Sequence, residues 1–126
     1  MKITQLDHLV LTVKDIDKTI DFYETVLGMQ KESFGEGRTA LLFGKQKINL
    51  HEYGKEFEPK AHLAVPGSED LCFITETPLA EAMQQALKQG VDIIEGPITR
   101  TGANGAIESF YIRDPDLNLI EVSNYL

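Results

Sequence analysis

The first half of the chain changes from a period of two to a helical period. Apolar and polar residues alternate from Leu6 to Val13, which predicts a central strand. Apolar residues then recur at helical spacing at Ile16, Ile20, Tyr23 and Leu27. Asp15 or Asp17 is expected to cap this helix, and Gly28 to end it.

Three short strands are expected after the helix, over residues 29–34, 39–43 and 47–53, separated by glycine-containing turns. In the last of them, Ile48 and Leu50 share one face, while Asn49, His51 and Tyr53 share the other. The first half is therefore predicted to be βαβββ.

The second half repeats this plan. A strand over 70–75 precedes Thr77-Pro78, which predicts a helix capped by Thr77 with Pro78 at its first position. Its apolar stripe is expected at Leu79, Met83, Ala86 and Leu87, and its end at Gly90. The segments that follow are predicted as a strand over 91–95 broken by Gly96-Pro97, a mobile loop over 101–105, and strands over 107–113 and 119–123 joined by a turn at 114–116.

Strand and helix recur at one fixed offset. His8 and Asp70 lie 62 positions apart, and so do Gly28 and Gly90. A shared offset at a strand start and a helix end indicates an internal duplication. The prediction is an α+β fold in one domain, 1–126, made of two βαβββ modules (about 5–54 and 69–125) joined by a linker, 55–68.

Each module has one helix, which can cover only one face of its sheet. If the two sheets form one curved mixed sheet, their uncovered faces make a cup. Five polar side chains are expected to point into it: His8, Asn49, His51, Asp70 and Glu121. Because burying such groups without partners is costly, a cation is a natural partner for them.

Each of these residues also has a purely structural interpretation. His8 could hydrogen-bond a neighbour, His51 could lie at the rim, and Asp70 could belong to a turn. Glu121 could form a salt bridge with Arg113 or Arg38. Strand parity cannot choose between Asn49 and His51, and His51 is favoured because imidazole binds divalent transition metals better than an amide oxygen does.

Several segments resemble the vicinal oxygen chelate superfamily of glyoxalases, bleomycin resistance proteins and dioxygenases: Asp7–Asp15, Phe22-Tyr23, Leu27–Met29 and Asp114–Val122. Four others resemble its glyoxalase-domain-containing subgroup, which includes a bacterial virulence-associated protein: Lys47–Glu52, Pro66–Cys72, Glu95–Pro97 and Arg100–Gly102.

The resemblance implies a divalent metal (Ni, Zn, Fe, Mn or Co) in the cup and a homodimer. The predicted metal ligands are His8, His51 and Glu121, and the predicted catalytic residues are Glu121 and Asp70. Two positions depart from glyoxalase I, because Asp70 stands where the second module usually has histidine, and Asn49 or His51 where glyoxalase I has glutamate.

The expected function is a glyoxalase-like, metal-dependent enzyme of the lyase or isomerase type, whose small substrate chelates the metal through adjacent oxygens. Two histidines and a carboxylate also resemble the facial triad of iron oxygenases, so a dioxygenase is the second enzyme interpretation. A metal-independent small-molecule binding or resistance protein is the third.

Composition and charge restrict the partners and the cellular location that we expect. The net charge is −8 and no basic cluster occurs, which argues against a nucleic-acid or membrane-surface partner. Cys72 is the single cysteine, so no internal disulfide can form and a reducing compartment fits. Neither a signal-peptide pattern nor an apolar run of membrane-spanning length is present, and a cytoplasmic location is expected.

Overall fold

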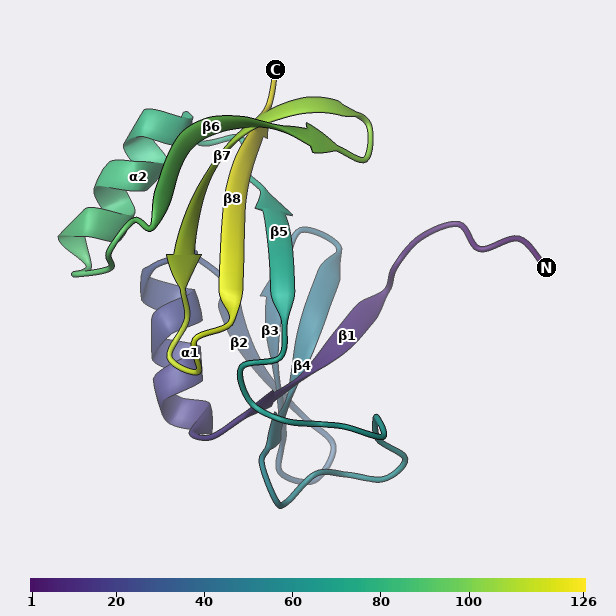
Figure 1. Cartoon of the computed structure of the whole chain (residues 1–126). Coiled ribbons are helices and arrows are strands. Elements are labelled where there is room, and N and C mark those ends of the chain that lie inside the picture. The colour runs from purple at the N-terminus through teal and green to yellow at the C-terminus, as the bar shows by residue number, and fades with distance from the viewer. The chain divides into compact units, whose positions relative to one another are not determined.

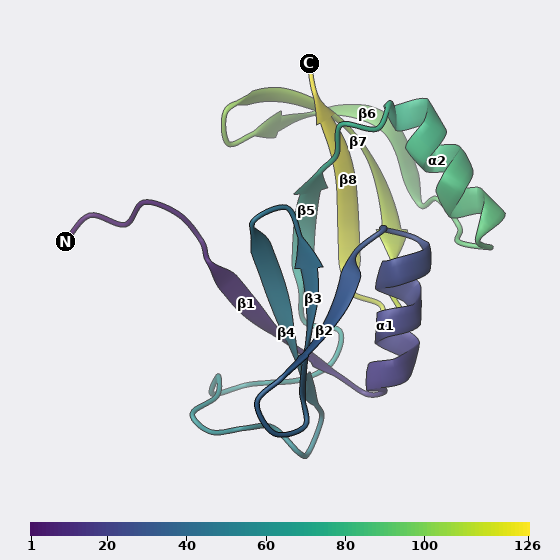
Figure 2. The ribbon, with the colours of Figure 1, turned by 180° about the vertical axis from the view of Figure 1, so that it is seen from behind.

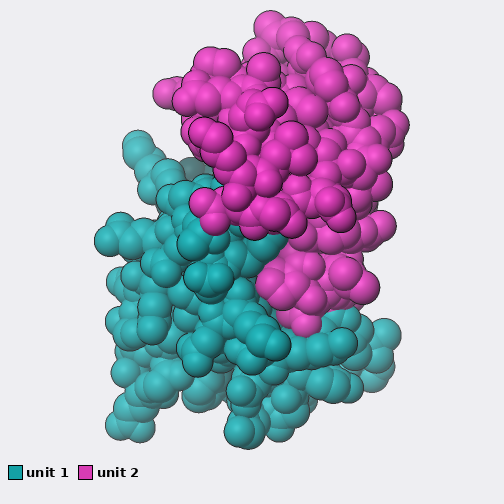
Figure 3. All heavy atoms as spheres, turned by 90° about the vertical axis from the view of Figure 1, so that its left-hand side faces the viewer, with its two compact units in different colours: residues 1–66 teal, residues 67–126 magenta.

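The computed structural model describes residues 1–126, which divide into two compact units. Unit 1 comprises Met1–Pro66 and unit 2 comprises Gly67–Leu126 (Figure 3). Each unit contains one helix and one four-stranded sheet.

Unit 1 has a mixed sheet with one helix against it (Figure 1). Its elements are β1 (His8–Val13), α1 (Ile16–Thr25), β2 (Gln30–Phe34), β3 (Arg38–Phe43) and β4 (Gln46–Glu52). The strand order is β1-β4-β3-β2, with β1 parallel to β4 and the other pairs antiparallel. The predicted βαβββ order of this half is confirmed.

Local sequence sets both ends of α1. Asp15 is the N-cap, and its Oδ1 accepts a hydrogen bond from the Lys18 backbone N–H at 3.0 Å. Gly28 follows the helix with φ +68°, a left-handed conformation that glycine adopts without steric cost. The helix therefore starts and stops where the capping residues predict.

The core of unit 1 lies between α1 and the face of the sheet that carries Leu11, Val13, Leu41, Ile48 and Leu50. Ile20 and Tyr23 supply the buried side of the helix. The opposite face of this sheet, which we call the helix-distal face of unit 1, carries the remaining side chains of the strands. Along β1 and β4 these are His8, Val10, Thr12, Lys47, Asn49 and His51.

Unit 2 repeats the arrangement (Figure 2). Its elements are β5 (Asp70–Ile74), α2 (Leu79–Lys88), β6 (Glu95–Gly102), β7 (Gly105–Arg113) and β8 (Leu119–Tyr125). The strand order β5-β8-β7-β6 matches that of unit 1, again with the first pair parallel. Phe110, Ile112, Ile120 and Val122 are buried on the face that α2 contacts, together with Leu79 and Ala86 of the helix.

The predicted start of α2 is wrong by one residue. Pro78, and not Thr77, occupies the N-cap position, with ψ 134° and no side-chain cap. The Thr77 N–H instead bonds to the Thr75 hydroxyl at 3.1 Å. Since Thr77 takes part in this local turn, the proline precedes the first helical residue.

The prediction for residues 91–105 is also wrong. Residues 91–94 form no strand, and β6 instead runs from Glu95 to Gly102, through Gly96-Pro97. The β6–β7 register shifts between Glu95 and Ile98, which accommodates the proline. Because β6 is an edge strand, the missing proline N–H breaks no interior ladder. The predicted mobile loop is a tight hairpin between β6 and β7.

A buried polar turn joins β7 to β8. The Asp114 carboxylate accepts bonds from the backbone N–H groups of Asp116 and Asn118, at 2.9 and 3.0 Å, and from the Asn118 side chain at 2.8 Å. Asn118 also accepts from the Glu69 N–H at 2.9 Å, which ties this turn to the start of β5. The turn therefore sets the position at which β8 pairs with β5.

Two four-stranded mixed sheets, each with one helix, confirm the α+β class. Neither helix is long and apolar enough to cross a membrane.

Candidate functional site

Glu121 is the most unusual polar residue of unit 2. It lies in β8 between the buried residues Ile120 and Val122, on the helix-distal face. Its Oε1 is buried and has no hydrogen-bond partner. No ion pair of the chain includes Glu121, so the alternative of a salt bridge with Arg113 or Arg38 is not realised.

The groups around Glu121 supply a donor and a distant positive charge. Cys72 pairs with it across the β5–β8 ladder, and Tyr111 pairs with it from β7. Partial burial raises the pKa of the Cys72 thiol, the hydrogen bond with Ser123 lowers it, and the charge of Glu121 raises it. The Arg100 guanidinium donates to Tyr111 Oη at 3.1 Å and attracts Glu121 without an ion pair. The thiol is therefore protonated at neutral pH and can donate to the carboxylate.

Asp70 is exposed at the start of β5, two residues before Cys72 on the same strand face. The negative charges of Asp70 and Glu121 both contribute to raising the pKa of the Cys72 thiol, so both carboxylates lie near this thiol. The structure thus brings the two predicted catalytic carboxylates to one face of unit 2.

His8 lies at the start of β1 with its side chain about half exposed. Its Nδ1 lies 2.8 Å from Asp7 Oδ2. When Nδ1 carries the proton for this bond, Nε2 keeps its lone pair, which is the arrangement found in carboxylate–histidine–metal triads. The neighbour that His8 was expected to hydrogen-bond is therefore Asp7. The same contact would also orient His8 as a metal ligand.

The strand register distinguishes Asn49 from His51. Val10 pairs with Asn49, and Thr12 pairs with His51. In unit 2 the residue two positions after Asp70 pairs with Glu121, so Asn49 is the counterpart of Glu121. Thr12, the partner of His51, is four residues after His8 on β1, or about 13 Å at 3.3 Å per residue. The register therefore favours Asn49 as the partner of His8.

Two further orphaned atoms lie on the helix-distal face of unit 1. Asn49 Oδ1 and His51 Nε2 are buried and have no hydrogen-bond partner, and their residues are only 6% and 4% exposed. Thr39 Oγ1 is also unpaired, on the opposite face. Buried polar atoms left without a partner at the positions that match Glu121 and Ser123 are suited to a ligand from outside the unit.

His51 has a cationic and aromatic environment. Its ring packs edge to face on Phe57, with centroids 5.5 Å apart. Burial, and then the nearby positive charge of Arg38, lower the pKa of His51, while Glu56 acts weakly in the other direction. His51 is therefore neutral at pH 7, and its unpartnered Nε2 can act as donor or acceptor according to the tautomer.

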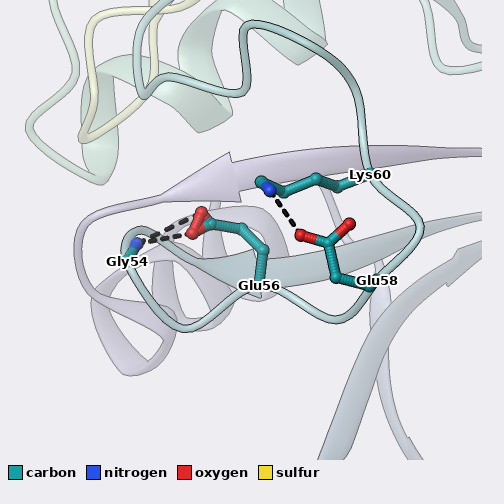
Figure 4. Close-up of polar contacts among 4 residues, drawn as sticks. All are labelled: Gly54, Glu56, Glu58 and Lys60. Carbon is teal, nitrogen blue, oxygen red and sulfur yellow. Dashed lines mark hydrogen bonds and ion pairs between the residues drawn. The ribbon is translucent and has the colours of Figure 1, made fainter.

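Polar contacts close the segment that carries Phe57 (Figure 4). Both carboxylate oxygens of Glu56 accept from the Gly54 N–H, at 2.6 and 3.2 Å. Lys60 forms an ion pair with Glu58. These contacts hold the turn after β4 and with it the ring that covers His51.

Within either unit, no three His, Cys, Asp or Glu side chains lie close enough to hold a metal ion. Unit 1 offers His8 with Asn49, and unit 2 offers Asp70 with Glu121. Each unit alone therefore carries only part of a ligand set.

Three residues of this region were not given their observed places from the sequence. Phe57 looks like an ordinary linker residue, and Arg38 was named only as a possible ion-pair partner of Glu121; a loop contact and cross-strand pairing bring both to His51. Cys72 was noted for redox chemistry alone. Its alternation with Asp70 on a strand was the one signal in the sequence that could have placed it beside Glu121.

The chain belongs to the Glyoxalase/Bleomycin resistance protein/Dioxygenase superfamily, whose family model matches residues 5–122. This establishes the family that the duplicated sheets and the Asp114–Val122 segment indicate.

Close relatives share the whole chain. It is 58% identical over 126 residues to virulence protein STM3117 of Salmonella typhimurium, covering 100% of this chain and 88% of that protein. An integron cassette protein from the mobile metagenome of V. cholerae has a solved structure with a TM-score of 0.98 and 66% identity, covering 100% of this chain and 98% of that chain. A more distant relative, metallothiol transferase FosB of Shouchella clausii, is 29% identical over 125 residues, covering 93% of this chain and 77% of that protein.

Proposed function

We propose that the protein is a divalent-metal-dependent enzyme that acts on a small substrate bearing two adjacent oxygens, by moving a proton next to a carbonyl group. The observation that carries this proposal is the buried, unpaired Glu121 Oε1. A carboxylate oxygen in this state costs stability, and a bound cation would remove that cost.

The donor set of the chain fits a divalent cation. His8 offers an Nε2 lone pair whose orientation Asp7 fixes. Asn49, Asp70 and Glu121 offer oxygens, and two of these, Asn49 Oδ1 and Glu121 Oε1, are buried without a hydrogen-bond partner. One imidazole nitrogen with oxygens is a donor set accepted by nickel, zinc, iron, manganese and cobalt. On this proposal the fourth-strand ligand is Asn49, and His51 has another role.

A bound metal would act as a Lewis acid toward the adjacent oxygens of the substrate. Glu121 is the candidate base, because its buried Oε1 has no hydrogen-bond partner and is available to receive a proton. The Cys72 thiol lies opposite Glu121 across the β5–β8 ladder and, being protonated, can donate to the carboxylate. Asp70 is the second acidic group on this face and completes the pair predicted to be catalytic.

One of the relatives supports part of the proposal. FosB is named a metallothiol transferase, which supports metal dependence within the superfamily. The name of STM3117 refers to virulence and gives no reaction. We further propose that the protein is a homodimer. One metal would then be held by ligands of a unit 1 and a unit 2 that belong either to the same chain or to two different chains.

Metal content is the direct test. The purified protein is incubated with Ni²⁺, Zn²⁺, Mn²⁺, Fe²⁺ or Co²⁺, dialysed, and analysed by mass spectrometry for metal per chain. We expect about one equivalent for wild type and a large loss for His8→Ala, Asn49→Ala and Glu121→Ala. His51→Ala should retain the metal. Equal, negligible metal in wild type and Glu121→Ala would refute metal dependence and favour a metal-independent binding protein.

The reaction class has its own readout. The metal-loaded protein in D₂O should exchange the proton next to the carbonyl of an α-hydroxy ketone or 2-oxo acid, followed by NMR. Glu121→Gln should abolish the exchange. Loss of a dissolved O₂ signal with such substrates, without proton exchange, would instead identify a dioxygenase.

A further inference from the structure

Two cations of unit 1 contact the same aromatic ring and lack a carboxylate partner. The Arg38 guanidinium carbon lies 5.1 Å from the Phe34 ring centre and 4.9 Å from that of Phe57. Lys47 Nζ lies 4.2 Å from the Phe34 ring centre. No ion pair of the chain includes Arg38 or Lys47. The net charge of the chain is −8, so carboxylates are plentiful, yet these two cations contact aromatic rings and pair with none of them. This arrangement leaves both positive charges available to an anionic ligand.

All of these groups lie on the helix-distal face of unit 1. Arg38 pairs with Phe34 across β2–β3, and on β3 it precedes Ala40, which pairs with Asn49. Arg38 and His51 both contact the ring of Phe57, with distances of 4.9 Å from the guanidinium carbon and 5.5 Å between ring centroids, so the two side chains lie close together. Of the nearby carboxylates, Glu56 is engaged by the Gly54 N–H and Glu32 is exposed on the edge strand β2. Neither one pairs with the cations.

His51 supplies the second, independent feature that points to a ligand. It is 4% exposed, and its buried Nε2 has no partner. In the tautomer with hydrogen on Nε2, the ring is a neutral donor beside the Arg38 guanidinium. An oxyanion there would receive charge-assisted hydrogen bonds from Arg38 and one from His51. Phe34 and Phe57 stack on the guanidinium faces and leave its N–H edges to the ligand.

We infer that Arg38, Lys47 and His51 form a subsite for a carboxylate of the substrate, distinct from the metal ligands. This inference rests on the proposed function and narrows its substrate class. His51 is two residues from Asn49 along β4, which is about 7 Å. The substrate would then carry its adjacent oxygens at one end and a carboxylate about 7 Å away at the other.

A matched pair of probes tests the subsite. 2-Oxoglutarate and 2-oxopentanoate share a five-carbon chain and a 2-oxo acid end, and only the first has a distal carboxylate. Calorimetric titration of the Mn²⁺-loaded protein should give at least about tenfold tighter binding for 2-oxoglutarate, as expected for charge-assisted bonds. Arg38→Gln and Lys47→Gln should reduce this preference while leaving 2-oxopentanoate affinity unchanged.

Lys31→Gln is the matched charge control, because Lys31 is on β2 with its side chain on the opposite face from Phe34. It should leave the preference unchanged. Circular dichroism and thermal unfolding of each variant separate a lost subsite from a lost fold, and Lys47→Gln keeps the test valid if Arg38→Gln fails to fold.

Glutarate separates this inference from the proposed function, since it has no adjacent oxygens. Glutarate binding to metal-free protein, lost in Arg38→Gln and Lys47→Gln, would support the subsite even if metal binding failed. Metal-loaded protein that binds both 2-oxo acids equally would overturn the subsite and leave metal dependence standing. A preference that also disappears in Lys31→Gln would overturn it too, because it would reflect total charge alone.

Discussion

Replacing Glu121 by methionine should stabilise the metal-free protein and destabilise it relative to wild type once metal is present. The variant removes the buried, unpaired Oε1 and keeps a side chain of similar length between Ile120 and Val122. An unsatisfied buried polar group costs roughly 1–3 kcal/mol. The substitution also loses the charge attraction between Glu121 and Arg100, which form no ion pair with each other, and the interaction of the carboxylate with the Cys72 thiol. A net gain of about 1 kcal/mol in the free energy of unfolding is therefore expected.

Metal should reverse this order. A ligand present at 100 times its dissociation constant stabilises the native state by about 2.7 kcal/mol. Wild type should gain that amount, and Glu121→Met should gain little, so wild type becomes the more stable by roughly 1.5–2 kcal/mol. Urea unfolding followed by circular dichroism, in EDTA and in excess Mn²⁺, measures both values, and the slope m should stay constant.

Glu121→Gln is the control that separates charge from burial. Its amide keeps a polar group in the same place, so it should gain less stability in EDTA than Glu121→Met. A Glu121→Met variant that is less stable than wild type in EDTA would refute the reasoning, because the carboxylate would then have a structural partner within the chain.

Three further outcomes follow from the structure. The pKa of His51 is lowered in the folded chain, so the unfolded chain takes up a proton first as the pH falls. The free energy of unfolding should therefore decrease below about pH 6.5, by at most about 1.4 kcal/mol per pH unit. In His51→Gln, the midpoint of urea unfolding should depend less on pH over this range. Gly96→Ala should cost more than about 3 kcal/mol or prevent folding, because its φ is +123° and a Cβ would lie 2.7 Å from Phe110 Cα and from Ser109 O; Gly37→Ala, at φ +68° in open space, should cost only about 1–2 kcal/mol by the same measurement. Asn118→Ala should cost roughly 2–4 kcal/mol in urea unfolding, because Asp114 and the Glu69 N–H lose buried partners; an unchanged midpoint would show that the β7–β8 turn does not depend on this side chain.

The sequence predicted the duplicated plan because its signals are local. Asp15 and Gly28 define one helix by capping and by a left-handed stop, and Gly90, with φ +77°, ends the other. Residues 91–105 were mispredicted because Gly96-Pro97 normally breaks a strand. Here the chain tolerates both residues through a register shift on an edge strand, and neither the shift nor the edge position is visible in the sequence.

The sequence predicted on which face of its strand each candidate site residue lies, but not which residues of neighbouring strands it pairs with. A period of two places Asn49 and His51 on the same face, so ligand chemistry alone decided between them, and it chose His51. The choice depends on which residue pairs with Val10, a long-range register that a single sequence does not encode. Arg38 and Phe57 were missed for the same reason, since they reach His51 from other strands and loops.

The shared register of the two units also shows how they differ in chemistry. The position that His51 occupies in unit 1 is occupied in unit 2 by Ser123. Ser123 is satisfied within its own unit by Ser109 at 2.7 Å and by the Cys72 sulfur at 3.4 Å, whereas His51 Nε2 remains open beside a cation. The neighbouring position shows the converse asymmetry, because Glu121 bears a carboxylate and Asn49 only an amide. On the function and subsite proposed above, one duplicated framework would give unit 2 the acid–base group and unit 1 the anion-recognising group. Glu121 variants should then alter turnover, and Arg38 variants should alter substrate choice.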